Sequence, residues 1–195
     1  MESETITFSA GALSLTADRY GDSTDPPVVF LHGGGQTRHS WGRAAAVVAE
    51  TGWCAITVDL RGHGESAWDP TGSYGLDDYA GDLVAVFDQL GHDPVVVGAS
   101  LGGLTAIRAM GGLRPGSGRG LILVDIVPEM ERTGTNRIGD FLRAHVETGF
   151  GSLEEAAEVV AAEPRAPTAP STLPGCERTC ESETAAGIGT GIRPF

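Results

Sequence analysis

The sequence predicts an α/β protein with a mostly parallel sheet covered by helices on both faces. Four short runs are apolar at nearly every position, which indicates strands buried on both faces rather than on one. Helical stretches alternate with these runs, and this alternation is typical of parallel strands joined by crossover helices. The runs are Val28–Leu31, Ala55–Asp59, Val95–Ala99 and Leu121–Ile126.

Before the first apolar run, the chain favours two β-like segments, Thr5–Ser9 and Ala12–Ala17. A turn at Asp25-Pro26-Pro27 then leads into the first buried strand. After it, Ser40–Thr51 has helical periodicity, with Trp41, Ala44, Ala45 and Val48 on one face.

The clearest helix is predicted over Leu76–Leu90. Its apolar residues recur at helical spacing, two acidic residues occupy the first turn and Gly91 follows its end. A further helix is expected over Leu101–Met110, ended by Gly111-Gly112.

A candidate nucleophile lies between the third apolar run and this last helix. The sequence Gly98-Ala99-Ser100-Leu101-Gly102 is G-x-S-x-G in a strand–turn–helix context, the pattern that holds a serine on a sharp bend. Flanking glycines allow strand and helix to approach each other around a strained residue. The alternative interpretation is an ordinary glycine-rich turn.

A second glycine motif, His32-Gly33-Gly34-Gly35, follows the first apolar run. Acyl transfer through a serine creates an oxyanion, which must be stabilised by N–H groups already in place. Gly34 and Leu101, the residue after the nucleophile, are the predicted oxyanion-hole donors. The alternative is a glycine turn that merely ends a strand.

With both motifs in order, about residues 5–160 resemble the α/β-hydrolase superfamily. The turn Asp59-Leu60-Arg61-Gly62-His63-Gly64-Glu65-Ser66 is similar to the D-x-R-G-H-G-x-S turn of that superfamily. The resemblance is strongest to single-domain hydrolases and haloperoxidase-like (perhydrolase) members, which need no cofactor or metal. It implies a small-molecule substrate, with pocket candidates His32, Gly33, Gly35 and His63. A serine at position 100 disfavours epoxide hydrolases, which carry aspartate there.

Serine chemistry also needs a general base and an acid that orients it. His145 is the one histidine after Ser100, and its place on an apolar helical stripe favours a packing role. The histidine that the resemblance implies is therefore absent from the pattern. Asp125, at the end of the fourth apolar run, is the candidate acid; its alternative role is to fix the following loop.

Three segments are expected. Residues 1–127 form the N-terminal part of the hydrolase core, and 128–163 begin a helical cap with helices over Asn136–Thr148 and Leu153–Ala162. Ser152-Leu153-Glu154-Glu155 has the pattern of a capping box. Residues 164–195 lack apolar periodicity and are interpreted as a disordered or out-of-frame tail, which would leave the last strands of the fold missing.

These features predict a serine hydrolase of ester or acyl substrates that is impaired in this chain. The alternatives are a catalytically dead fragment, a non-enzymatic small-molecule binder, or perhydrolase-like activity in an intact form. A net charge of −13 disfavours nucleic acid and anionic membranes as partners. No signal-peptide pattern is present, so a cytoplasmic location is expected. An exposed strand at Leu121–Ile126 would allow self-association through the sheet edge.

Overall fold

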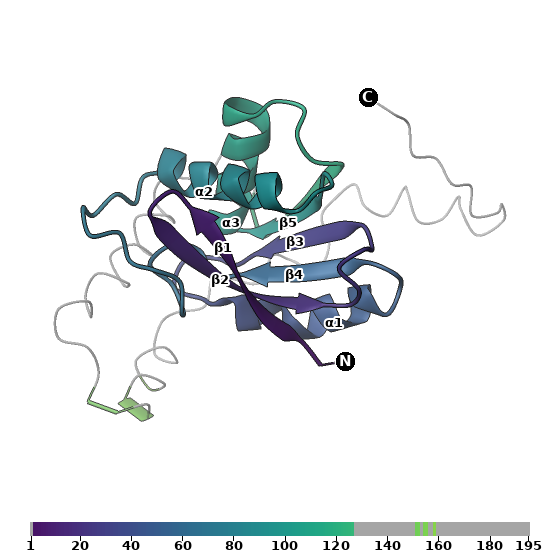
Figure 1. Ribbon diagram of the computed structural model, residues 1–195. Coiled ribbons are helices and arrows are strands. Elements are labelled where there is room, and N and C mark those ends of the chain that lie inside the picture. Colours follow the sequence, from purple (N-terminus) through teal and green to yellow (C-terminus); the bar gives the residue numbers. More distant parts are fainter. Residues whose placement is uncertain (1, 127–150, 153, 156–157, 159–195) are drawn as a thin grey trace, which may run out of the picture. The chain divides into compact units, whose positions relative to one another are not determined.

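A computed structural model describes residues 2–126, 151–152, 154–155 and 158 of the chain. Within them, six strands form one sheet in the order β1-β2-β4-β3-β5-β6 (Figure 1). β3, β4, β5 and β6 are parallel to their neighbours in this group, whereas β2 is antiparallel to both β1 and β4. The strands are Glu4–Ala10 (β1), Leu13–Tyr20 (β2), Pro27–Leu31 (β3), Cys54–Val58 (β4), Val95–Ala99 (β5) and Gly120–Val124 (β6).

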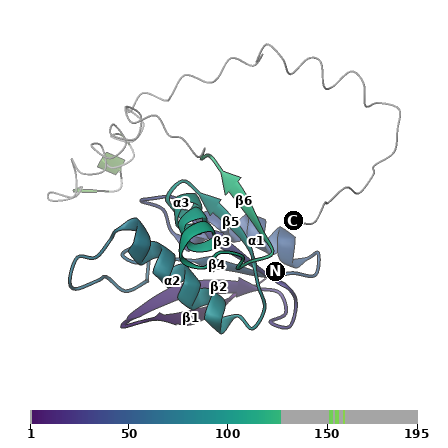
Figure 2. The same cartoon turned by 90° about the horizontal axis from the view of Figure 1, so that it is seen from above.

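Helices cover both faces of this sheet, as the alternating pattern predicts. α1 (Gly42–Ala49) packs on one face, and α2 (Leu76–Gln89) and α3 (Leu101–Arg108) pack on the other (Figures 1 and 2). Successive residues of a strand point to opposite faces, so β3 contributes to two cores. Val29 and Leu31 pack in the α2–α3 core, and Val28 and Phe30 in the α1 core.

Most elements differ from the predicted bounds by one or two residues, and three differences go further. β2 continues to Tyr20 because its second half pairs with β4, from Ala17 opposite Val58 to Tyr20 opposite Ala55. The first predicted helix begins as a 3-10 turn, η1 (Arg38–Trp41), before α1.

The third difference lies after α3. Gly111 and Gly112 do not end the helix, which continues as a π-helical turn, η2 (Ala109–Leu113). The N–H of Arg114 donates to the carbonyl of Ala109 at 2.8 Å, a bond one residue longer than the α-helical kind.

α2 begins and ends as its sequence predicts. The carboxylate of Asp78 accepts the N–H of Gly75 at 2.8 Å, which satisfies a free donor at the start of the helix. Gly91 follows the C-cap with φ +70°, the left-handed conformation that commonly ends helices.

Few residues are described beyond position 126. The hydroxyl of Ser152 accepts the N–H of Glu155 at 3.1 Å, and the Glu155 carboxylate accepts the N–H of Gly151 at 2.7 Å. Most of the helix predicted over Leu153–Ala162 lies outside the described residues. The boundaries predicted at 127/128 and 163/164, the helix over 136–148 and the tail lie outside the described residues. Within the described ranges, no helix combines the length and apolar character needed to cross a membrane.

Candidate active site

Ser100 lies on a sharp bend between β5 and α3. Its backbone angles are φ 45° and ψ −112°, a strained conformation for a residue with a side chain, and its side chain is exposed. The flanking glycines are required by close backbone contacts. A Cβ on Gly98 would lie 2.6 Å from the carbonyl oxygen of Gly102, and one on Gly102 would lie 2.5 Å from that of Leu31.

Asp125 occupies the corresponding position after the neighbouring strand. β5 and β6 pair with Ala99 opposite Val124, so Ser100 and Asp125 leave the sheet side by side. Asp125 has φ 52°, and these two are the non-glycine residues with positive φ in the part of the chain that the structure describes. The structure therefore brings the predicted acid and the predicted nucleophile to the same edge, with Asp125 exposed.

The glycine motif after β3 lies against this bend. A Cβ on Gly33 would be 3.5 Å from Cβ of Ser100, and one on Gly34 would be 3.9 Å from Cδ2 of Leu101. The carbonyl of His32 accepts the N–H of Gly102 at 3.2 Å, which ties the loop to the first turn of α3. The two glycine motifs, which are more than sixty positions apart in the sequence, thus lie against each other.

The N–H groups of the glycine loop have different partners. That of Gly33 donates to the side-chain oxygen of Gln36 at 3.1 Å, and that of Gly35 donates to Nε2 of His63 at 3.3 Å. Gly34 N–H and Leu101 N–H have no acceptor among the described residues. These are the two donors that the sequence predicts for an oxyanion hole.

His32 is fully buried, and both of its ring nitrogens are in use. Nδ1 donates to the carbonyl of Gly33 at 2.8 Å, and Nε2 accepts the N–H of Leu60 at 3.0 Å. Burial lowers the pKa of His32 below its ordinary value of 6.5, which favours the neutral ring that these bonds require. His32 therefore joins the glycine loop to the turn after β4, and it is placed too deep to line a pocket.

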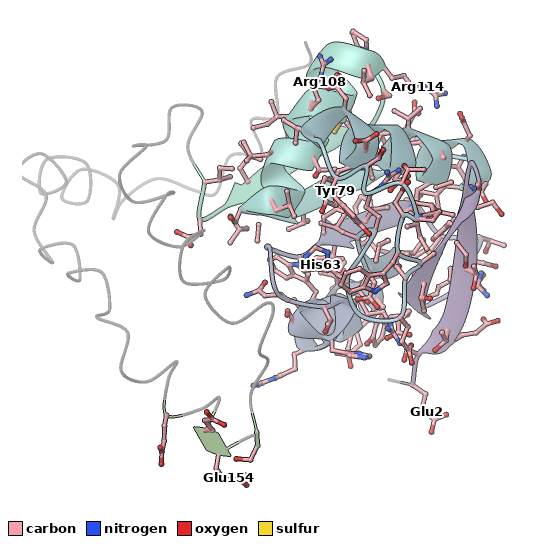
Figure 3. The ribbon with its side chains drawn as sticks, turned by 90° about the vertical axis from the view of Figure 1, so that its left-hand side faces the viewer. Glu2, His63, Tyr79, Arg108, Arg114 and Glu154 are labelled. Atoms are coloured by element: carbon pink, nitrogen blue, oxygen red, sulfur yellow. The ribbon has the colours of Figure 1, made fainter. Side chains whose placement is uncertain are left out.

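His63 belongs to that turn and lies at the carboxyl ends of the strands, between the α1 layer and the α2–α3 layer (Figure 3). Its Nδ1 lies 3.0 Å from the carbonyl of Arg61, so this nitrogen donates and Nε2 is the acceptor for Gly35. The rings of His32 and His63 are 5.0 Å apart. In this arrangement neither Nε2 is available to take a proton from Ser100.

An ionic cluster beneath the loop is a feature that sequence reasoning missed. The carboxylate of Asp59 accepts the N–H and a guanidinium N–H of Arg38, both at 2.6 Å, and the N–H of Glu65 at 3.0 Å. The Arg38 guanidinium also contacts Asp18 and Glu65. Burial alone would raise the pKa of Asp59, but these hydrogen bonds hold it below its ordinary value of 3.8.

The cluster fixes the segment that follows the glycine loop. The motif beginning at Asp59 marked this turn as important, but nothing in the sequence pairs it with Arg38, twenty-one positions earlier. Such a pairing depends on the parallel neighbours β3 and β4 ending at the same edge of the sheet.

The described part of the structure places none of the remaining histidines beside Ser100. His39 is exposed, with Nδ1 at 3.5 Å from the Asp18 carboxylate. His92 precedes β5, whereas Ser100 follows it, so the length of that strand separates them. His145 lies outside the described residues.

Comparisons with known proteins identify the fold family. The family model described as "alpha/beta hydrolase fold" matches residues 26–150. Esterase Rv0045c of Mycobacterium tuberculosis is 41% identical over 151 residues, which cover 74% of this chain and 48% of the esterase. The mouse sn-1-specific diacylglycerol lipase ABHD11 is 41% identical over 127 residues, or 64% of this chain and 40% of the lipase. The chain thus spans less than half the length of these two relatives.

Solved structures share the fold. Epoxide hydrolase VrEH1 from Vigna radiata aligns over 87% of this chain and 60% of its own, with a TM-score of 0.68 and 24% identity. The thioesterase domain from the curacin biosynthetic pathway aligns over 82% and 61%, with a TM-score of 0.65 and 25% identity. Because the family model covers well over half of the sequence and the sheet has the matching architecture, this chain belongs to the α/β-hydrolase family.

Proposed function

We propose that this protein is a serine hydrolase of ester or related acyl substrates, with Ser100 as nucleophile. One observation carries the proposal. Ser100 is held exposed on a strained bend, directly beside a glycine loop whose Gly34 N–H has no acceptor among the described residues. Strain of this kind costs roughly 1–3 kcal/mol, and it is usually retained where function needs the geometry. The relatives named above as an esterase and a lipase support the same class of substrate.

In the proposed reaction, Oγ of Ser100 attacks the substrate carbonyl carbon as a general base takes the hydroxyl proton. The N–H groups of Gly34 and Leu101 donate to the resulting oxyanion. Collapse of the tetrahedral intermediate breaks the bond to the leaving alcohol, which takes up the proton and leaves an acyl-serine. Water then attacks the acyl-serine, so that the acid is released and Ser100 is restored. Asp125 is the proposed orienting acid, from its place beside Ser100.

A binder of acyl compounds with very slow turnover is the second candidate, and one specific observation favours it. Within residues 2–126, the two histidines that contact the glycine loop, His32 and His63, use their Nε2 atoms to accept backbone N–H groups. Loss of a triad histidine typically costs about a millionfold in kcat. A chain without a base would therefore bind acyl compounds and turn them over very slowly.

The test uses the full chain with a fluorophosphonate probe and a p-nitrophenyl ester. A serine hydrolase is expected to be labelled at Ser100 and to release nitrophenol, and Ser100→Ala is expected to abolish both. Ser40→Ala, at an exposed serine of η1, is the matched control and should be labelled like the wild type. Ligand binding without labelling would favour the binder, and labelling that persists in Ser100→Ala would refute Ser100 as nucleophile.

A further inference from the structure

The glycine loop after β3 needs something to hold it in one conformation. Three consecutive glycines have more backbone freedom than any other tripeptide, so a catalytic N–H in their midst is aimed only if its neighbours are fixed. Two side chains fix them. Gln36 accepts the N–H of Gly33 from within the loop, and His63 accepts the N–H of Gly35 from the turn after β4.

His63 is itself oriented by contacts at Nδ1, the ring nitrogen that does not bind Gly35. Its Nδ1 donates to the carbonyl of Arg61, and the Arg61 guanidinium donates two bonds, each 2.6 Å long, to the buried carboxylate of Asp82 in α2. Another guanidinium N–H donates to the carbonyl of Ser73 at 2.9 Å. These hydrogen bonds to Asp82 raise the pKa of Arg61 above its ordinary value, whereas burial raises the pKa of Asp82. An unbroken series of contacts thus runs from α2 through Arg61 and His63 to Gly35.

We propose that His63 is a positioning residue for the oxyanion hole: its neutral imidazole accepts the Gly35 N–H and thereby aims the Gly34 N–H at the substrate carbonyl oxygen. This inference rests on the function proposed above. It gives His63 a role different from that of a pocket-lining or merely turn-forming side chain. The acceptor must be an unprotonated Nε2, because a donor at this atom would oppose the N–H of Gly35.

If His63 positions the oxyanion hole, its replacement should slow the reaction of Ser100 with the probe without weakening probe binding to the same extent. A misdirected oxyanion donor lowers the rate of the bond-forming step, and displacement of a catalytic group by about 1 Å can cost roughly a hundredfold. His63→Ala should therefore lower the maximal rate of phosphonylation of Ser100 by about tenfold to a hundredfold, with the half-saturating probe concentration nearly unchanged. His63→Gln, whose side-chain oxygen can accept the same N–H, should recover part of the rate.

The experiment measures phosphonylation of the full chain against probe concentration for wild type, His63→Ala, His63→Gln and His92→Ala. His92 is an exposed histidine at the opposite end of β5 and is the matched control. In parallel, nuclear magnetic resonance follows the amide resonances of Gly33 and Gly35. The Gly35 resonance should move in His63→Ala, whereas that of Gly33, which is bound to Gln36, should not.

The two proposals fail in different ways. A wild-type chain that is not labelled at Ser100 refutes the proposed function, while the Gly35 resonance still reports whether His63 holds the loop. Labelling of His63→Ala at the wild-type rate overturns the positioning role even though Ser100 is the nucleophile. An equal loss of rate in His63→Ala and His63→Gln, with an unmoved Gly35 resonance, also overturns it.

Discussion

His32 and His63 join the same two loops in opposite directions. His32, from the glycine loop, accepts the N–H of Leu60 in the turn after β4, and His63, from that turn, accepts the N–H of Gly35 in the glycine loop. Their rings lie 5.0 Å apart, and each donates through Nδ1 to a backbone carbonyl. Two neutral imidazoles therefore hold the loops together, and a proton on either Nε2 removes one of the two connections.

The first prediction concerns acid and His32. Because burial lowers the pKa of His32 in the folded chain, the unfolded chain binds more protons as the pH falls below about 6.5. The free energy of unfolding should therefore decrease from pH 7 towards pH 5. The decrease should continue until the pH falls below the lowered pKa of His32 in the folded chain. Urea unfolding at several pH values should show a smaller decrease in His32→Gln than in the wild type. An unchanged pH dependence in His32→Gln would contradict this assignment.

The second prediction concerns strain at Ser100. Glycine adopts positive φ without steric cost, so Ser100→Gly should relieve about 1–3 kcal/mol of strain. The glycine also gives the unfolded chain more backbone freedom, and this offsets roughly 0.5–1 kcal/mol of the stability gained by relieving the strain. The net expectation is a more stable protein that no longer reacts with a fluorophosphonate. Ser40→Gly, in the 3-10 turn η1, should instead lower the melting temperature. A lower melting temperature in Ser100→Gly as well would argue against strain at the bend.

The third prediction compares two glycines. A methyl group on Gly98 would lie 2.6 Å from the carbonyl oxygen of Gly102 and 2.7 Å from Cα of Gly103, both backbone atoms, which shift less easily than the end of a flexible side chain. Gly98→Ala should destabilise the protein by about 1–3 kcal/mol or more. A methyl group on Gly81, in α2, would meet nothing within 4 Å, so Gly81→Ala should stabilise by roughly 0.5–1 kcal/mol. Differential scanning calorimetry of the two variants should give shifts of opposite sign.

Part of the fold and of the candidate site could be predicted from the sequence. The strands of the parallel group and the helix α2 were predicted within a residue or two, because burial on both faces and helical spacing are local patterns. The closeness of Ser100, Gly34 and Leu101 follows from strands that end at one edge of the sheet. The bond from Gly35 to His63 could not be predicted, since it depends on the ring orientation of a residue in a distant turn.

The fourth prediction concerns the buried charges beneath the glycine loop. Arg38 is 5% exposed and Asp59 is fully buried, so Arg38→Met would leave the carboxylate without its main cation. Breaking a buried pair in this way typically costs about 3–5 kcal/mol. Arg114 and Asp88 form a pair on the surface, and Arg114→Met should cost at most about 1 kcal/mol. Urea unfolding of both variants checks the difference; equal losses would mean that the Arg38 cluster contributes no more than a surface pair.

The last prediction concerns the sheet edge at β6. Within the described residues, β6 pairs on one side with β5, and its side chains Ile122 and Val124 are 52% and 37% exposed. An apolar strand with unpaired backbone groups is a template for pairing with another chain, and a charge on it opposes such pairing. We propose that the chain self-associates through this edge. Sedimentation velocity should show that association increases with concentration in the wild type and is weakened in Ile122→Lys. Val47→Lys, at a similarly exposed valine of α1, should associate like the wild type. A wild-type chain that stays monomeric throughout the concentration series, or equal weakening by both lysines, would show that β6 is not the contact.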